Sequence, residues 1–294
     1  MIGLPVLPPG KRPVPPVVPG QKQLWKLRKD LLHNGLLRTI ISVCIVPVLF
    51  LLVKRAGLKY DRKEVIRVSL SQKRLFLLDM DGTIYLSDRL FDGSREFLQD
   101  VKNTGGRYLF LTNNSSRGTQ SYIEKLGRMG IPAAPEDFLT SADAAVDYLQ
   151  RTYPADTGYY VCGTRSFKAQ LSASGLRVCE KADGQASVVL LGYDTELSYE
   201  KLESCCILLM RGCDYVATHP DLVCPTWYGS APDCGSVIEM LFTATGRRPV
   251  VIGKPQPAMA LMALKKFGFS KSEACLIGDR VYTDVACGVN AGID

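Results

Sequence analysis

Beyond residue 72, short runs of apolar residues alternate with longer stretches of helix length. This alternation predicts an α/β protein, in which helices cover both faces of a parallel sheet. The predicted strands are Leu75–Leu78, Tyr108–Thr112, Tyr159–Cys162, Val188–Leu191, Tyr215–Thr218, Val250–Ile252 and Ala274–Ile277. The predicted helices are Ser94–Thr104, Gln120–Met129, Ala142–Gln150, Tyr199–Arg211, Ser236–Thr245 and Pro257–Phe267.

The first predicted strand leads directly into two carboxylates, Asp79 and Asp81, followed by Gly82 and Thr83. A buried parallel strand delivers its last residues to the edge of the sheet where α/β proteins place their sites. Paired acids there can hold a divalent cation, and one of them can act as a nucleophile. Asp and Gly are also common in ordinary turns, so this segment alone leaves both interpretations open.

Three later strand ends also carry polar side chains. Thr112, Asn113 and Asn114 follow one strand, and their hydroxyl and amide groups suit either a phosphate oxygen or a helix cap. Lys254 follows another strand and can neutralise phosphate charge, although a single lysine there can equally be a solvated surface charge. A further strand ends at Asp279, with Asp284 five residues later, which adds two possible ligands for magnesium.

Taken together, the motifs DxDGT, TNN, GKP and GDxxxTD occur in this order, each at a predicted strand end. They resemble the haloacid dehalogenase superfamily of aspartate-nucleophile phosphatases. The segments LFLLDMDGTIY, LFLTNNSSR and GDRVYTDVACGVNAG are similar to the class IIA branch, with its NagD-like and p-nitrophenylphosphatase-like enzymes. The resemblance covers about residues 73–294 and implies a Rossmann-like parallel-sheet core with an inserted α/β cap domain.

The resemblance also implies a role for each motif residue. Asp79 is expected to be the nucleophile that becomes aspartyl-phosphate, and Asp81 the acid and base. Thr112 and Lys254 would hold the phosphoryl group. The expected ligands of Mg²⁺ are Asp79, the backbone carbonyl of Asp81, Asp279 and Asp284.

About 100 residues separate the second motif from the third, which is long enough for a separate folding unit. The resemblance implies a catalytic core at 71–142 and 246–294, with an inserted cap domain at 143–245 that closes over the site. The resemblance further implies that substrate is bound by Asn113, Asn114, His219, Asp221, Gly235 and Ser236. For His219, a purely structural role remains open.

Composition separates residues 1–70 from the rest, because they hold 13 Lys and Arg against 3 Asp and Glu, whereas the remaining residues hold 23 against 26. The near balance beyond residue 70 gives no support to nucleic-acid binding. Residues 1–70 are expected to form a Pro-rich, basic extension of uncertain structure. Within it, the uncharged segment 39–53 would span about 22 Å as a helix, which is short for a bilayer. The expected location is cytoplasmic, with membrane attachment through this segment as the alternative.

Ten cysteines without a CxxC pair, together with only two histidines, favour free thiols in a reducing compartment over a zinc site. The expected function is a Mg²⁺-dependent phosphatase for small phosphomonoesters such as nucleotide or sugar phosphates. An inactive relative that only binds phosphometabolites is one alternative. A receiver-type signalling module is another, but it lacks the DxD spacing and the long insertion. Self-association through the cap is a further expectation.

The sequence ends at Asp294, soon after the fourth motif, where members of the resembled family continue into a further strand and helix. We therefore expect the chain to be C-terminally truncated and the strand that ends at Asp279 to have one unpaired side. Because this strand is apolar and carries no charge that protects an edge, marginal stability or self-association is expected.

Overall fold

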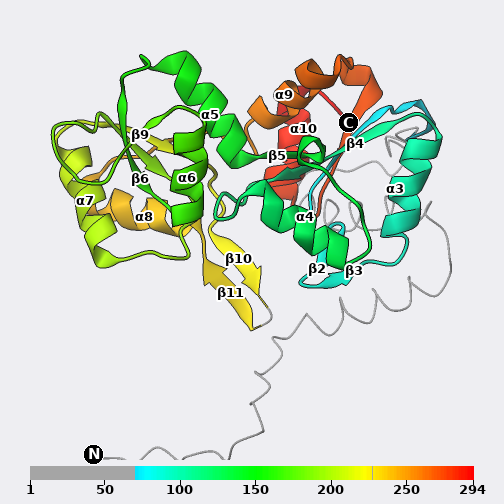
Figure 1. The fold of residues 1–294 in the computed structure, drawn as a ribbon, viewed down its shortest axis with the longest axis horizontal. Coiled ribbons are helices and arrows are strands. Elements are labelled where there is room, and N and C mark those ends of the chain that lie inside the picture. Colours follow the sequence, from blue (N-terminus) through cyan, green and yellow to red (C-terminus); the bar gives the residue numbers. More distant parts are fainter. Residues whose placement is uncertain (1–69, 227) are drawn as a thin grey trace, which may run out of the picture. The chain divides into compact units, whose positions relative to one another are not determined.

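The computed structural model describes residues 70–226 and 228–294. These residues form two parallel sheets with helices packed around them, and two short hairpins (Figure 1). The alternation of apolar runs and helical stretches therefore correctly predicted an α/β protein. The predicted extension and its segment 39–53 lie outside the described residues. Within the described part, no helix is long and apolar enough to cross a membrane.

The first sheet has the strand order β13-β1-β4-β5, with every neighbouring pair parallel. Its strands are β13 (Ala274–Ile277), β1 (Leu75–Leu78), β4 (Arg107–Thr112) and β5 (Phe138–Thr140). The helices that alternate with these strands or follow them are α3 (Ser94–Asn103), α4 (Thr119–Arg128), α5 (Ser141–Thr152), α9 (Ala258–Phe267) and α10 (Ala286–Ala291). Short helical turns lie at Leu70–Gln72, Pro135–Asp137 and Lys271–Glu273, and a π-helical turn at Val281–Val285.

Strand β1 shows why this sheet is central. All four of its residues are buried, and alternate side chains enter different hydrophobic clusters: Leu75 and Leu77 enter one, whereas Phe76 and Leu78 enter the other. Side chains alternate between the two faces of a strand, so both faces of the sheet are covered. The strand therefore ends at a fixed place, and the polar residues that follow it are held firmly.

The second sheet has the order β12-β9-β8-β6-β7 and is also parallel. Its strands are β12 (Val250–Val251), β9 (Asp214–Ala217), β8 (Val188–Leu191), β6 (Gly158–Cys162) and β7 (Arg177–Cys179). The helices of this part are α6 (Arg165–Ala173), α7 (Tyr199–Met210) and α8 (Cys234–Thr245). One hydrophobic cluster contains residues of both sheets, for example Leu77 and Leu190, so the two sheets share a core.

Two antiparallel hairpins complete the described fold. They are formed by β2 (Tyr85–Leu86) with β3 (Arg89–Leu90), and by β10 (Val223–Thr226) with β11 (Gly229–Pro232). The first follows the DxDGT motif directly, and the second follows the loop that contains His219. Their short strands lie outside both sheets, so they can shape the loops beside them.

All seven predicted strands are present, with ends within one residue of the prediction. Helix α6, strands β5 and β7 and the four hairpin strands were missed, and each of these strands has only two to four residues. Strand β12 pairs with β9 in the second sheet, although the expected boundaries assign 246–294 to the core. The division into core and cap stays a proposal, and this pairing favours a boundary after Val251.

Strand β13 pairs with β1 on one side only among the described strands. On its other side, the N–H of Leu276 donates to the backbone carbonyl of Asp294 at 2.7 Å, and Ile293 is buried in the shared core. The last residues thus pack against the strand that positions Asp279.

Candidate active site

The carboxylate of Asp79 stands directly after β1. Its backbone N–H donates to the carbonyl of Ile277 at 2.9 Å, which continues the pairing of β1 with β13. One carboxylate oxygen accepts from the Lys254 ammonium at 2.7 Å, and the other accepts from the Thr83 hydroxyl at 3.4 Å. Burial raises the pKa of Asp79 from 3.8 to about 7; the Lys254 ammonium opposes this rise, and the Asp284 carboxylate adds to it.

Lys254 is almost completely buried, with 2% of its side chain exposed. Its ammonium donates to Asp79 at 2.7 Å, to Asp284 at 2.6 Å and to the backbone carbonyl of Leu111 at 2.9 Å. Burial alone would lower the pKa of Lys254, but the two carboxylates outweigh it and hold the pKa above its usual value. The ammonium therefore carries a permanent positive charge beside Asp79, so the interpretation of Lys254 as a solvated surface charge is wrong.

Asp79, Asp279 and Asp284 form one carboxylate cluster, in which one ligand oxygen of each lies within 4.8 Å of the others. Burial first, and then the neighbouring Asp284 carboxylate, raise the pKa of Asp279 above its usual value. Three carboxylates that converge on one place are the donor set that a divalent hard cation prefers. The residues present therefore fit the expected Mg²⁺ site.

Two glycines make room for this cluster. Gly82 has a φ of 96°, and a Cβ at this position would lie 2.3 Å from Oδ2 of Asp279. At Gly278, a Cβ would lie 2.2 Å from Cγ of Asp284. Both positions need glycine, because any side chain would push a carboxylate out of the cluster.

Asp81 lies outside the carboxylate cluster, and 46% of its side chain is exposed. One of its oxygens accepts from the Tyr85 hydroxyl at 3.3 Å, and the other lies 3.6 Å from the Lys125 ammonium. A carboxylate that is accessible to solvent and sits two residues from Asp79 is suitably placed for proton transfer.

The segment after β4 joins the core motifs to one another. Thr112 is buried at the strand end, and its hydroxyl accepts from the N–H of Asn114 at 3.2 Å. The Asn113 amide donates to the carbonyl of Lys254 at 3.0 Å and accepts from its N–H at 2.9 Å, so it fixes the backbone there. The Asn114 side chain accepts from the N–H and hydroxyl of Ser116 and so stabilises a turn.

A second group of buried polar residues surrounds His219, whose side chain is completely buried. Its ring nitrogens face different carboxylates: Nδ1 lies 3.5 Å from Asp221 and Nε2 lies 3.6 Å from Asp233. The amide of Asn113 donates to Asp221 at 3.1 Å, and the guanidinium of Arg280 lies 3.4 Å from it. The His219 ring thus lies between the carboxylates of Asp221 and Asp233. Of these two, Asp221 contacts Asn113 and Arg280.

The two remaining residues expected to bind substrate, Gly235 and Ser236, contact the backbone of the loop that contains Asp221. The N–H of Gly235 donates to the carbonyl of Asp221 at 2.8 Å, and a Cβ on Gly235 would lie 2.2 Å from the carbonyl of Pro220. The hydroxyl of Ser236 donates to the carbonyl of Leu222. Gly235 and Ser236 therefore contact the loop backbone and fix its path.

The structure brings together Asp79, Asp279, Asp284 and Lys254, as the motifs predicted, and places Thr112 and Asn113 beside them. Sequence reasoning missed three residues of this region: Tyr85, Lys125 and Arg280. Arg280 follows Asp279 directly and lay within a recognised motif. Lys125 stands in α4 without any motif, so no local signal could have found it.

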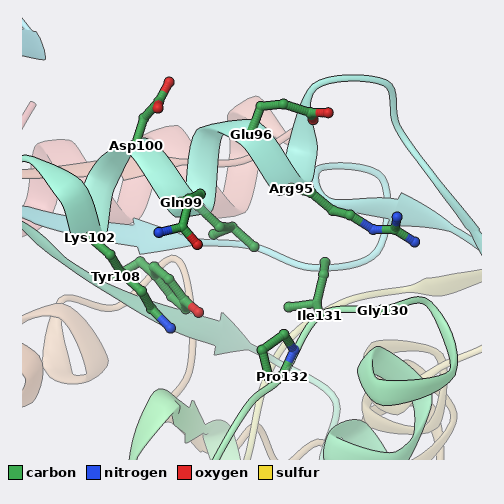
Figure 2. Close-up of a pocket in the computed structure, with 10 residues that line it drawn as sticks. Arg95, Glu96, Gln99, Asp100, Lys102, Tyr108, Gly130, Ile131 and Pro132 are labelled. Carbon is green, nitrogen blue, oxygen red and sulfur yellow. The ribbon is translucent and has the colours of Figure 1, made fainter.

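A separate cavity of about 450 Å³ lies between α3, Tyr108 and the loop after α4 (Figure 2). None of the expected catalytic residues lines it. Its basic side chains already have partners, because the Arg95 guanidinium donates to the carbonyl of Met129 and the Lys102 ammonium lies 5.0 Å from the centroid of the Tyr108 ring. With Glu96 and Asp100 also present, the lining shows no preference for an anion.

Comparison with known proteins identifies the family. Residues 76–177 match the model of the haloacid dehalogenase-like hydrolases, and residues 251–294 match a second HAD-hydrolase-like model. The chain is 33% identical over 225 residues to an acid sugar phosphatase of Staphylococcus aureus. The matched region covers 76% of this chain and 86% of that protein. This chain belongs to the haloacid dehalogenase-like hydrolases.

Solved structures similar to this hydrolase identify its branch within the family. A 4-nitrophenylphosphatase from Thermotoga maritima is 41% identical, with a TM-score of 0.73 over 76% of this chain and 85% of that one. A glycerol phosphate phosphatase from Mycobacterium tuberculosis, solved in complex with magnesium, is 29% identical with a TM-score of 0.71, over 76% of this chain and 67% of that one. The expected class IIA membership and Rossmann-like fold are thereby confirmed, and the hydrolase is a phosphatase of phosphoric monoesters.

Proposed function

We propose that this hydrolase removes the phosphoryl group from small phosphomonoesters in a Mg²⁺-dependent reaction that passes through an aspartyl-phosphate. The observation that carries the proposal is the contact of Asp79 with the Lys254 ammonium at the edge of the carboxylate cluster. A carboxylate nucleophile can approach an anionic phosphate only where positive charge offsets their repulsion. Bound Mg²⁺, held by Asp79, the carbonyl of Asp81, Asp279 and Asp284, would supply further positive charge at the phosphate oxygens.

The protein side chains account for two displacement steps. In the first, a carboxylate oxygen of Asp79 attacks phosphorus, the bond to the leaving alkoxide breaks, and Asp81 gives that alkoxide its proton. In the second, Asp81 removes a proton from water, the water oxygen attacks phosphorus, and the Asp79 carboxylate is released. Thr112 and Lys254 hold the phosphoryl oxygens during both steps.

For the substrate, the proposal is a sugar or polyol phosphate, with nucleotides as the second choice. The names of the acid sugar phosphatase and the glycerol phosphate phosphatase support this choice. Arg280, which belongs to the fourth motif, and Asp221, which it contacts, are proposed to contact the part of the substrate beyond the phosphate. Because His219 is completely buried, we propose that it acts by orienting Asp221. Gly235 and Ser236 are proposed to act by holding the same loop, and Asn114 by holding its own turn.

A panel of phosphorylated metabolites, with p-nitrophenyl phosphate as reference ester and released phosphate as readout, tests the proposal. The expected result is turnover with Mg²⁺, loss of turnover on chelation and recovery when Mg²⁺ is restored. Complete absence of turnover, together with retained binding of phosphometabolites, would support the alternative of an inactive relative. Turnover that survives chelation would contradict the metal dependence.

A further inference from the structure

Two side chains outside the four motifs, Tyr85 and Lys125, surround the carboxylate of Asp81. Tyr85 donates its hydroxyl proton to one oxygen at 3.3 Å, and the Lys125 ammonium lies 3.6 Å from the other. The same ammonium lies 3.8 Å from the centroid of the Tyr85 ring. Each of the three side chains therefore contacts the other two.

Two of the three side chains have fixed positions. Tyr85 is completely buried and packs in a hydrophobic cluster with Met80 and Phe110. A tight turn brings it back beside Asp81, since the N–H of Gly82 donates to the carbonyl of Tyr85 at 2.8 Å. Lys125 stands on α4, the helix that follows the Thr112 segment, and 19% of its side chain is exposed.

Asp81 itself is different, because nearly half of its side chain is exposed and the carboxylate cluster of Asp79, Asp279 and Asp284 does not include it. An exposed aspartate side chain samples several rotamers unless neighbouring groups select one. Proton transfer needs the carboxylate within hydrogen-bond reach of the leaving oxygen, so the choice of rotamer affects the rate.

We propose that Lys125, supported by Tyr85, is a positioning residue that holds the Asp81 carboxylate in the orientation needed for proton transfer to the leaving group. The inference rests on the proposed function, in which Asp81 is the acid and base. Lys125 acts through Asp81 and makes no contact with the reacting phosphoryl group. An ion pair with one largely exposed partner contributes little to folding stability, so Lys125 is expected to affect the reaction rate more than the melting temperature.

The test compares two esters whose leaving groups differ in their need for a proton. An alkyl phosphate such as glycerol phosphate requires protonation of its leaving oxygen, whereas p-nitrophenyl phosphate does not. In Lys125→Met, kcat/KM for the alkyl ester is expected to fall by about 10- to 100-fold, because a misplaced catalytic group typically costs this much. For p-nitrophenyl phosphate, kcat/KM is expected to change by less than about threefold.

A matched control is available on α3. Lys102 also lies over a tyrosine ring, that of Tyr108, but it lines the separate cavity (Figure 2). Lys102→Met removes the same charge and the same type of ring contact, and both esters should retain their kcat/KM. Lys125→Arg should recover most of the lost activity, because it restores the positive charge beside Asp81.

A double-mutant cycle separates positioning from other roles. Asp81→Asn should show the same selectivity between the two esters, and adding Lys125→Met to it should cause no further loss. Tyr85→Phe, which keeps the ring in the core, should give a smaller loss of the same selectivity. If Lys125→Met does not melt cooperatively, the comparison of the two esters in Tyr85→Phe tests the inference in its place.

Three outcomes would overturn the inference. Equal losses for both esters in Lys125→Met would mean that the ammonium binds the phosphate itself. Additive losses in the double variant would mean that Lys125 acts independently of Asp81. If Asp81→Asn also lost activity equally for both esters, the acid role of Asp81 in the proposed function would fail, and the inference with it.

Discussion

At the scale of single residues, Lys254 connects the parts of the site more than any other side chain does. Its ammonium bonds to two carboxylates and one backbone carbonyl, which belong to three different motif segments. A buried cation with this many anionic partners both holds the loops together and neutralises the site. Its removal should therefore affect stability and catalysis together.

Lys254→Met is expected to lower kcat by about 10²-fold or more, because a charge that stabilises the transition state is lost. The free energy of unfolding should fall by about 3–5 kcal/mol, since two buried carboxylates lose their partner. Steady-state kinetics and urea unfolding measure the two effects. Lys266→Met, at an exposed position on α9, is the control and should change neither. Unchanged activity in Lys254→Met would contradict the assigned role.

The residues of the four motifs could be predicted from the sequence, because each follows an apolar strand whose end is unambiguous. Asp79 follows a strand of four consecutive buried residues, and its place at the sheet edge follows from that pattern alone. The contacts of Lys125 could not be predicted in the same way, because Lys125 meets Asp81 through the packing of α4 against the loop. The sequence likewise gave no sign that the His219 ring would be completely buried.

At the scale of elements, the site depends on the short loops that follow the strands and on the glycines within them. Two residues of the DxDGT loop position different carboxylates. The Thr83 hydroxyl donates to Asp79, and Gly82 leaves room for the Asp279 side chain. The loop therefore couples β1 to β13 through side chains as well as through the sheet. Strand β5, which the sequence did not reveal, pairs with the end of β4, and Ser141 directly after it donates its hydroxyl to the carbonyl of Asn113. Strand β7, also missed, lies at the edge of the second sheet.

Gly82→Ala should reduce activity by about tenfold or more, because the added methyl group meets the Asp279 carboxylate and because φ at this position is positive. The Mg²⁺ concentration for half-maximal activity should rise in parallel. The control is Gly127→Ala on α4, where nothing lies within 4 Å of the added carbon. That change should stabilise the protein by about 0.5–1 kcal/mol with activity retained. Normal metal dependence in Gly82→Ala would contradict this view of the loop.

At the scale of the whole molecule, the two sheets share one hydrophobic cluster, and polar contacts join the loop at Asp221 to the core motifs. The family resemblance predicted the two sheets, whereas the detailed contacts of Asp221 depend on packing that no motif specifies. Self-association through the cap, cytoplasmic location and the alternative of membrane attachment remain predictions. The boundaries of the proposed core and cap also remain predictions.

Deletion of residues 1–69 should leave a protein that melts cooperatively and retains kcat/KM for p-nitrophenyl phosphate within about twofold. The reason is that both sheets and all expected catalytic residues lie beyond residue 70, and the similarity to known phosphatases covers the same part. Thermal unfolding and kinetics of the shortened protein provide the measurement. Loss of the cooperative melt would show that the deleted segment packs on the core.

The central claim is that Asp79 carries the phosphoryl group between the two steps, and the Asp81→Asn variant tests it most directly. This variant should release p-nitrophenol almost normally but hydrolyse the intermediate slowly, because acid–base catalysis is worth about 10²- to 10⁴-fold. Rapid mixing with p-nitrophenyl phosphate and Mg²⁺ should give a burst of p-nitrophenol stoichiometric with enzyme. Peptide mapping should then find the phosphoryl group on Asp79, and none in the control that also carries Asp79→Asn. A phosphoryl group on any other residue, or steady turnover without a burst or a labelled enzyme, would contradict the account.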